Sequence, residues 1–364
     1  VVQLPIIILF VWRNKNMRFP EFLKSDGTIG FVAPSFGCNT EPYKTAFKNA
    51  QKKLGELGHK FDIGPNCYAG DGIGISSTPQ NCGKELTDYY CSENNDALIS
   101  CGGGELMCET LDYVDFEKIM QAKPKWYMGF SDNTNFTFLL TTICDVASIY
   151  APCAASFGME PWHESIQDAY DVLTGKKNIV KGYPMWEKEG IRDEEHPLLP
   201  YNLTEKRELY YYIPGVGGSM ARDYEVFLSG RLIGGCMDCL VNLAGTNFDK
   251  VARFNERYEN DGIIWFLESC DLNVMGIRRA LWNMEHAGWF KHVKGFIIGR
   301  PLCFGSDMMG MNQYNAVTGI LSKYKVPIIM DVDLGHLSPM MPVICGSYAK
   351  INAFGNDISI KMTN

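Results

Sequence analysis

The chain has 364 residues, more than the roughly 250 to 300 at which a single hydrophobic core stops growing, so we expect two domains. With 46% hydrophobic and 21% charged residues it can bury enough apolar surface to fold, which excludes a disordered or low-complexity protein. The 34 Lys and Arg against 42 Asp and Glu give a net charge of -8. This is the wrong sign for gripping a phosphate backbone, so no nucleic-acid partner is expected.

The first 16 residues need separate treatment. The run VVQLPIIILFV is apolar for only about 11 residues, too short to span a bilayer. It also lacks the basic lead and small-residue cleavage site of a signal peptide. Because WRNKN follows and Met17 opens a more conventional start, we interpret residues 1–16 as an upstream or non-native extension and expect no membrane attachment.

The chain has 13 cysteines, an odd number scattered along its length, whereas a disulfide scaffold is short and cysteine-dense. We therefore expect reduced thiols in a cytoplasmic protein. Cys236 and Cys239 in GGCMDCL have the spacing of metal ligands, but no second CxxC or His pair is placed to complete a zinc site. We interpret this pair as core packing.

From residue 28 onward, strand-like apolar runs alternate with amphipathic stretches. Residues 28–34 predict a strand and residues 43–58 a helix. A strand at 96–100 then precedes a glycine run and a helix, and a strand at 125–130 precedes another helix. Repeated strand–helix units predict an α/β protein with a mostly parallel sheet. Ligands gather at the carboxyl ends of the strands in such sheets.

The alternation breaks between about residues 160 and 215, where charges, prolines and aromatics follow no sustained period. We therefore expect an N-terminal α/β domain at residues 17–160, a linker or surface excursion at 161–214, and a second domain at 215–364. The second domain has further strand-like runs and at least one helix, enough to support a core of its own.

Ser131 lies in WYMGFSDNTNFTFLL, where a hydrophobic strand ends and a helix begins within a few residues. A nucleophile elbow needs this placement, because the sharp turn exposes the hydroxyl above the sheet and points helix amides at developing negative charge. The hydrolase pattern is GxSxG, whereas here Asn133 stands at the second glycine. The alternative is that Ser131 or Asp132 merely caps the helix.

A glycine run, Gly102 to Gly104, follows Cys101 at the end of another predicted strand. Glycines let the backbone approach a ligand closely, so the run could cradle a phosphate or form half of an oxyanion hole, or it could be a tight turn. No GxGxxG or GxxxxGK[ST] pattern accompanies it, which argues against nucleotide binding through these motifs. Cys101 itself is a weaker candidate nucleophile.

Glu268 and His336 each follow a run apolar enough to be a buried strand. A serine protease triad needs a carboxylate, an imidazole and a hydroxyl that converge from separate strand ends, and the chain order Ser, Glu, His is one known solution. Among the six histidines, His336 is the best-placed base. The alternative is a histidine satisfied by nearby backbone in a DxGH turn.

The chain resembles the LD-carboxypeptidases (muramoyl-tetrapeptide carboxypeptidases) and their relatives, the microcin C self-immunity proteins. The resemblance covers nearly the whole chain from about residue 28. It rests on segments that occur in the family's order: TIGFVAPS, ISCGGGE, MGFSDNT, GRLIGG with AGT, FLES and DVDLGH. It implies a flavodoxin-like N-terminal domain and a smaller β-rich C-terminal domain, with the active site across the cleft between them.

The family's catalytic residues match Ser131, Glu268 and His336, so the resemblance implies a Ser-His-Glu triad with no metal or cofactor. His336 would accept the Ser131 proton while Glu268 orients the ring. Backbone amides of Asp132 and of the Gly103–Gly104 turn are the candidate oxyanion donors. The family also suggests a homodimer.

Two segments depart from the family's pattern. Cys236 and Met237 stand where many members have an asparagine-containing GGNL, so substrate contacts made by that asparagine do not carry over. Trp186 lies in a long excursion that is more similar to the immunity branch, in which an aromatic loop stacks on a nucleobase. A lone tryptophan at this place can equally pack between domains.

We consider three candidate functions for this protein. The first is a serine carboxypeptidase that cuts an amide next to a terminal carboxylate, such as the terminal D-alanine of a muropeptide. The second is a hydrolase of a peptide-nucleotide antibiotic, in which Trp186 would bind the base. The third is a non-catalytic two-domain protein that closes on a small ligand. A Ser131–His336 separation of about 3 Å would separate the enzymes from the binding protein.

Overall fold

A computed structural model describes residues 17–220 and 224–364. The extension expected at residues 1–16 lies outside the described residues. Within the described ranges, no helix is both long enough and apolar enough to cross a membrane.

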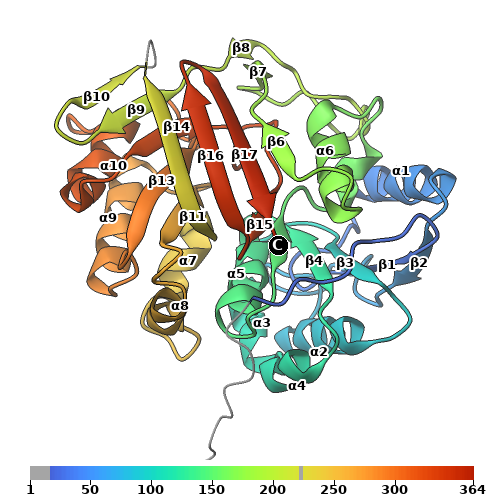
Figure 1. Cartoon of the computed structure of the whole chain (residues 1–364). Helices are drawn as coiled ribbons and strands as arrows, with labels where there is room; N and C mark the ends of the chain where they lie inside the picture. Colours follow the sequence, from blue (N-terminus) through green and yellow to red (C-terminus); the bar gives the residue numbers. More distant parts are fainter. Residues whose placement is uncertain (1–16, 221–223) are drawn as a thin grey trace, which may run out of the picture.

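The first sheet is built by the strand–helix units expected from the sequence (Figure 1). Its strands run in the spatial order β2, β1, β3, β4 and β5, all parallel, which is the order of flavodoxin-like folds. The expected α/β class and flavodoxin-like first domain are therefore confirmed. The strands are β1 (Thr28–Val32), β2 (Lys60–Ile63), β3 (Ala97–Ser100), β4 (Trp126–Gly129) and β5 (Ser148–Tyr150).

Helices cover both faces of this sheet (Figure 1). Every side chain of α5 is buried, because the helix is enclosed between the first sheet and the neighbouring β11. Its uncharged sequence, TNFTFLLTT, suits that position, because the hydroxyls of Thr137, Thr141 and Thr142 donate to carbonyls four residues earlier and leave no exposed polar face. The helices of this half are α1 (Tyr43–Glu56), α2 (Pro79–Cys91), α3 (Met107–Thr110), α4 (Phe116–Gln121), α5 (Thr134–Thr142) and α6 (Glu164–Leu173).

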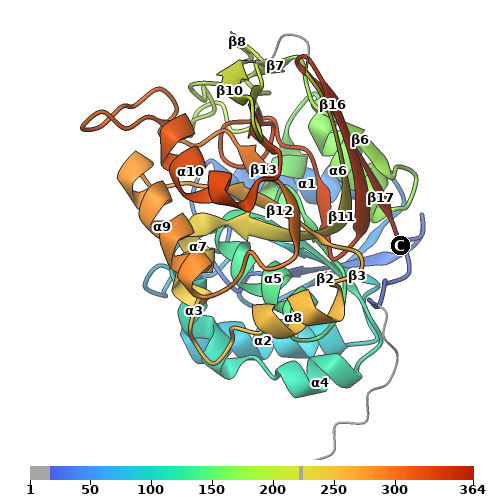
Figure 2. The same cartoon turned by 60° about the vertical axis from the view of Figure 1, so that its left-hand side comes forward.

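The second sheet has a parallel centre and antiparallel edges. In the described part of the chain it holds nine strands, and helices line one of its faces (Figure 2). Its central strands are β11 (Glu225–Cys236), β12 (Ile263–Glu268), β13 (Val293–Gly299) and β14 (Ile328–Val332). Along the chain, α7 (Met237–Leu243) and α8 (Val251–Arg257) follow β11, α9 (Val274–His286) follows β12, and α10 (Gln313–Leu321) lies between β13 and β14. Its remaining strands are β6 (Ile179–Lys181), β9 (Tyr210–Ile213), β10 (Gly217–Met220), β16 (Tyr348–Phe354) and β17 (Asp357–Thr363).

The strands cross the domain limits expected from the sequence. Strand β15 (Val343–Cys345), from the C-terminal part of the chain, pairs antiparallel with β5 at the edge of the first sheet. The excursion at 161–214 contributes α6, places β6 and β9 in the second sheet, and forms a small hairpin from β7 (Met185–Trp186) and β8 (Glu205–Lys206). These strands have only two to four residues, too short to show a period in the sequence.

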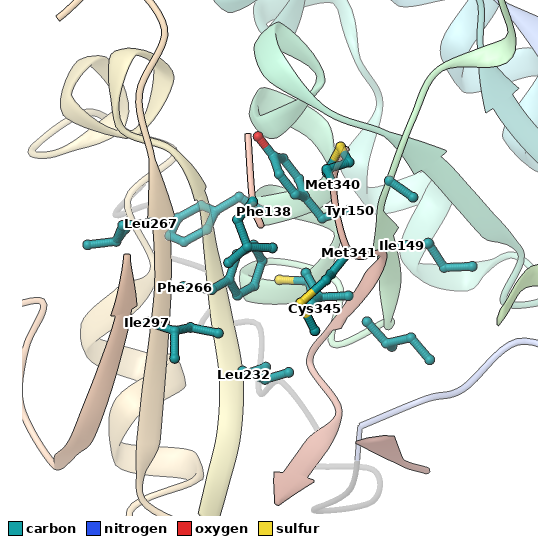
Figure 3. Packing of buried hydrophobic residues seen from close by; sticks show 14 of the residues in the cluster. Phe138, Ile149, Tyr150, Leu232, Phe266, Leu267, Ile297, Met340, Met341 and Cys345 are labelled. Carbon is teal, nitrogen blue, oxygen red and sulfur yellow. The ribbon is translucent and has the colours of Figure 1, made fainter. Parts of the chain in front are cut away.

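Side chains from both sheets share one hydrophobic core (Figure 3). Phe138 of α5 is fully buried and stacks at 5.3 Å between ring centroids on Trp289, and it also contacts Trp265 of β12. Tyr150 of β5 packs on Phe266 of β12, with ring centroids 5.5 Å apart. The carboxyl ends of β4, β5 and β12 are therefore held together by packing.

Candidate active site

Ser131 lies on a sharp turn between β4 and α5. Phe130 is extended, Ser131 has a φ of 62°, and a single 3-10 turn (Ser131–Asn133) leads into α5. A left-handed φ is strained for a residue with a Cβ and is typical of a nucleophile elbow. Asn133, in place of the usual second glycine, donates hydrogen bonds to the carbonyls of Phe130 and Gly102. The asparagine therefore fastens the turn to the neighbouring glycine run.

The structure brings together the three residues expected to form a triad. The Ser131 Oγ lies 2.9 Å from His336 Nε2, and His336 Nδ1 lies 2.8 Å from Glu268 Oε2. Ser131 follows β4 of the first sheet, whereas Glu268 ends β12 and His336 follows β14 of the second. The imidazole therefore bridges a hydroxyl and a carboxylate in the order that general-base activation of a serine requires.

Tyr150 completes this hydrogen-bonded chain and was missed by the sequence analysis. Its hydroxyl donates to Glu268 Oε1 at 2.5 Å and accepts from the Ser131 amide at 3.2 Å. The residue is fully buried and ends β5, beside β4. The available signal was a polar side chain at the carboxyl end of a strand next to the one that carries the serine.

A glycine is needed beside the imidazole. Gly335 has a φ of 99°, and a Cβ built on it would lie 2.5 Å from Glu268 Oε2. Any side chain there would push the carboxylate away from His336. The ring itself contacts Phe130, with ring centroids 5.2 Å apart. These contacts fix the imidazole between the turn that carries Ser131 and the end of β12.

The carboxylate and the imidazole change each other's pKa. Burial alone would lower the pKa of His336, but the Glu268 charge and hydrogen bonds with Glu268 and Cys270 outweigh burial, so the pKa is raised well above its usual value. Burial would raise the pKa of Glu268, yet the His336 charge and hydrogen bonds from His336, Tyr150 and Cys236 lower it. The pair therefore favours a charged imidazolium next to an ionised carboxylate.

The glycine run lies against Ser131. A Cβ built on Gly103 would lie 3.2 Å from both Cβ and Oγ of Ser131. In the described part of the chain, the amides of Gly103, Gly104 and Asp132 donate no hydrogen bond to a protein acceptor. Free amides beside a serine hydroxyl can stabilise an oxyanion. The expectation that these three amides do so stays a prediction.

The side chain of Asp132 has a structural use that the sequence did not reveal. Its buried carboxylate accepts hydrogen bonds from Ser35 Oγ at 2.6 Å, the Met107 amide at 2.9 Å and Asn135 Nδ2 at 2.9 Å. Burial raises the pKa of this carboxyl, although the three donors oppose the shift. Because Ser35 lies against Gly104 in space and Met107 follows the glycine run by three residues in sequence, Asp132 ties that run to the elbow.

The Cys236 and Cys239 pair is buried beside the site. The Cys239 thiol points at the Ser131 carbonyl, with 3.6 Å between sulfur and oxygen, and the Cys236 amide donates to Thr134 Oγ1 at 2.9 Å. All 13 cysteines lie in the described ranges and are free thiols. Among the residues described, no group of three or more His, Cys, Asp or Glu is placed to hold a metal ion.

Trp186 is 4% exposed and does not present its face to solvent. Its indole nitrogen donates to the Lys206 carbonyl at 3.1 Å, and its ring packs edge-on against Phe304 with centroids 5.2 Å apart. The Arg300 guanidinium lies 4.7 Å from the ring centroid. These contacts favour the packing interpretation of Trp186 over nucleobase stacking.

A cavity of about 340 Å³ opens on the imidazole side of the site. Phe130, Gly335 and His336 form its inner wall, and residues 187–201 supply much of the outer wall. Trp186 is not among the lining residues.

Comparison with known families gives two matches that follow each other along the chain. The LD-carboxypeptidase N-terminal domain matches residues 29–151, and the LD-carboxypeptidase C-terminal domain matches residues 229–351. Together these ranges contain all three residues of the hydrogen-bonded Ser131, Glu268 and His336 chain.

Curated relatives are distant but full-length. The microcin C7 self-immunity protein MccF of Escherichia coli is 23% identical over 339 residues, with 92% of each chain covered. The putative carboxypeptidase YocD of Bacillus subtilis is 23% identical over 340 residues, covering 91% of this chain and 95% of the relative.

Solved structures share the fold. MccF in complex with glutamyl sulfamoyl guanosine superposes with a TM-score of 0.76 at 21% identity, covering 94% of this chain and 98% of that one. An MccF-like protein from Bacillus anthracis gives a TM-score of 0.76 at 23% identity, covering 95% of this chain and 100% of that one. The two-domain architecture is therefore the same in these proteins.

The coupling between His336 and Glu268 predicts a titration that depends on one charge. In the native protein, His336 should lose its proton only well above the usual histidine pKa, because the carboxylate stabilises the imidazolium. In Glu268→Gln that charge no longer opposes burial, so the His336 pKa should fall from its value in the native protein. NMR titration of the histidine ring measures both curves.

Glu256→Gln is the matched control, because Glu256 is an exposed carboxylate on α8 and its removal should leave the His336 curve in place. Equal His336 pKa values in the native protein and in Glu268→Gln would contradict the assigned coupling.

Proposed function

Because this chain belongs to the LD-carboxypeptidase family, we propose that it is a serine carboxypeptidase that cleaves an amide bond next to a terminal carboxylate. The terminal D-alanine of a muropeptide is the substrate group we expect. The observation that carries the proposal is the Ser131–His336–Glu268 chain, with 2.9 and 2.8 Å between successive polar atoms. A separation of this size supports a catalytic serine over a purely ligand-binding cleft.

The chemistry begins from the deprotonated form of His336, whose share grows as the pH rises toward the raised pKa of the ring. Its Nε2 accepts the Ser131 proton as Oγ attacks the carbonyl carbon of the substrate. The carbonyl oxygen gains the negative charge and is stabilised by the amides of Gly103, Gly104 and Asp132. One such donor is typically worth roughly 10² to 10³ in rate. His336 then gives the proton to the leaving amine, which breaks the amide bond and leaves an acyl-serine.

Water completes the reaction. His336 takes a proton from a water molecule, the resulting hydroxide attacks the acyl carbon, and Ser131 recovers its proton as the acid product departs. Glu268 remains ionised throughout, and it holds the ring with Nδ1 toward the carboxylate and stabilises the imidazolium. The other carboxylate oxygen, Oε1, accepts a hydrogen bond from the Tyr150 hydroxyl, so Glu268 has one orientation in which both oxygens are paired.

A second candidate is a hydrolase of peptide-nucleotide antibiotics. It is favoured by the similarity to MccF, a microcin C7 self-immunity protein whose structure is known with glutamyl sulfamoyl guanosine. The burial of Trp186 removes the stacking surface that this function would use at that residue. The carboxypeptidase is therefore the function we put first.

Mass spectrometry of reaction products separates the candidates. The native protein and Ser131→Ala are each incubated with a muropeptide tetrapeptide and with an aminoacyl-sulfamoyl adenosine. We expect the native protein to release D-alanine from the tetrapeptide and Ser131→Ala to be slower by several orders of magnitude, because the nucleophile is lost. Serine-dependent cleavage of the nucleotide analogue alone would favour the second candidate, and activity on neither would favour the binding protein.

The hydroxyl of Tyr150 should contribute to turnover. In Tyr150→Phe the buried Glu268 loses one donor and the Ser131 amide loses its acceptor, so we expect kcat to fall about tenfold through misplacement of the triad. Steady-state kinetics on the tetrapeptide measure the change. Tyr211→Phe is the matched control, because it removes a buried hydroxyl that donates to the Gly355 carbonyl outside the triad. Equal kcat values for the two variants would show that Tyr150 does not position the triad.

A further inference from the structure

The direction of proton transfer identifies one side of the site. His336 must hand its proton to the leaving amine, so the leaving group lies on the imidazole side of Ser131. The proposed oxyanion donors Gly103 and Gly104 belong to the glycine run, in which Gly103 packs against Ser131 itself. The cavity of about 340 Å³ is lined by His336 and by Phe130, so it occupies the place of the leaving group.

A loop between β7 and β8, residues 187–204, forms the outer wall of this cavity. Strand pairing of Trp186 with Glu205 closes its base. The Glu187 amide donates to the Ser338 carbonyl at 2.7 Å, two residues beyond His336. At the other side, the Glu160 amide donates to the Leu198 carbonyl at 2.9 Å. The loop is thus fastened both to the segment that carries the imidazole and to the N-terminal half of the chain.

Arg192 is the cation that this loop places in the cavity wall. No carboxylate in residues 17–220 or 224–364 lies within ion-pair distance of its guanidinium, which rests over the Tyr43 ring at 5.8 Å from the centroid. The carboxylate of Glu187, in the same wall, instead accepts a hydrogen bond from the Asn202 amide at 2.5 Å. Arg192 therefore retains free donors on the leaving-group side of the triad.

Two buried arginines of the chain are used differently. Arg207 and Arg300 are both buried and both pair with Asp333, which anchors the excursion to the end of β14. Their charges are already paired within the protein. Arg192 is partly exposed and has no such partner, so its place in the wall is not explained by folding.

We propose that Arg192 binds the terminal carboxylate of the leaving amino acid and so makes the enzyme a carboxypeptidase, an inference that rests on the proposed function. A guanidinium matches the planar geometry of a carboxylate and can donate two parallel hydrogen bonds to it. In a C-terminal residue the carboxylate carbon is two bonds from the scissile nitrogen. When the scissile nitrogen lies within reach of His336 Nε2, the terminal carboxylate therefore lies in the cavity that Arg192 lines. An internal residue would offer a neutral amide at the same place.

The test compares two peptides on four proteins. One peptide is a muropeptide tetrapeptide with a free D-alanine carboxylate, and the other is the same peptide with a C-terminal carboxamide. The proteins are the native enzyme, Arg192→Gln, Arg192→Lys and Arg279→Gln, where Arg279 is an exposed control on α9. The quantity measured is kcat/KM for each peptide.

The native enzyme should prefer the carboxylate over the carboxamide by about 10- to 100-fold, the value of a charge-assisted hydrogen bond. Arg192→Gln should lose that preference by slowing only the carboxylate peptide, to about the rate of the carboxamide. Arg192→Lys should keep part of it, because a point charge remains without the planar fork. Arg279→Gln should behave as the native enzyme does.

A full preference in Arg192→Gln, with the native enzyme active, would overturn the assignment of Arg192 and leave the proposed function standing. Turnover of neither peptide by the native enzyme would instead reject the proposed function, and the carboxylate assignment with it. Retained carboxamide turnover in Arg192→Gln also shows that the variant is folded, so a lost preference can be attributed to the guanidinium.

Discussion

Glu268 is a carboxylate at 1% exposure, and the site is organised around keeping it ionised. An unpaired buried charge is expensive, and in practice it is neutralised or paired. Here both oxygens are occupied, one by His336 and the other by Tyr150. The same two partners also contact Ser131, through the imidazole and through the tyrosine hydroxyl. The requirement to pair one buried charge therefore also positions Ser131, the residue that we propose as the nucleophile.

The four residues of this hydrogen-bonded group, Ser131, His336, Glu268 and Tyr150, come from both sheets. The packing between the sheets must therefore be rigid for the proposed chemistry to work. Phe138 and Tyr150 supply that packing against the second sheet, and β15 returns from the C-terminal part of the chain to pair with β5. Side chains in close-packed cores move little without loss of contacts. Because such a core moves little, the residues of a site built across it keep their relative positions, as the hydrogen bonds of 2.8 and 2.9 Å require.

The first sheet and the three candidate site residues could be predicted from the sequence, because the end of a buried strand is visible as the end of an apolar run. The first sheet followed from repeated apolar runs and helices, and Ser131, Glu268 and His336 each stand at the end of such a run or within four residues of it. Their convergence came from the family resemblance, because chain order alone does not bring strand ends together. The oxyanion role of the glycine run stays a prediction, and the structure places Gly103 of that run against Ser131.

Other features depend on tertiary contacts that no local pattern encodes. Tyr150 ends a strand of three residues, and only the pairing of β5 with β4 brings its hydroxyl to Glu268. The sequence left Trp186 open between nucleobase stacking and packing, and only the folded chain brings it against Phe304 and Arg300. The free guanidinium of Arg192 is visible only once the hydrogen bonds that fix residues 187–204 are known.

The central claim is that His336 activates Ser131 as a nucleophile, and covalent labelling tests it without a choice of substrate. The native protein and His336→Ala are treated with a fluorophosphonate, digested and mapped by mass spectrometry. The account predicts one adduct, on Ser131, that forms in the native protein and is strongly reduced in His336→Ala. Labelling of Ser131 at the same rate in both proteins, or no adduct on Ser131 in the folded native protein, would contradict it.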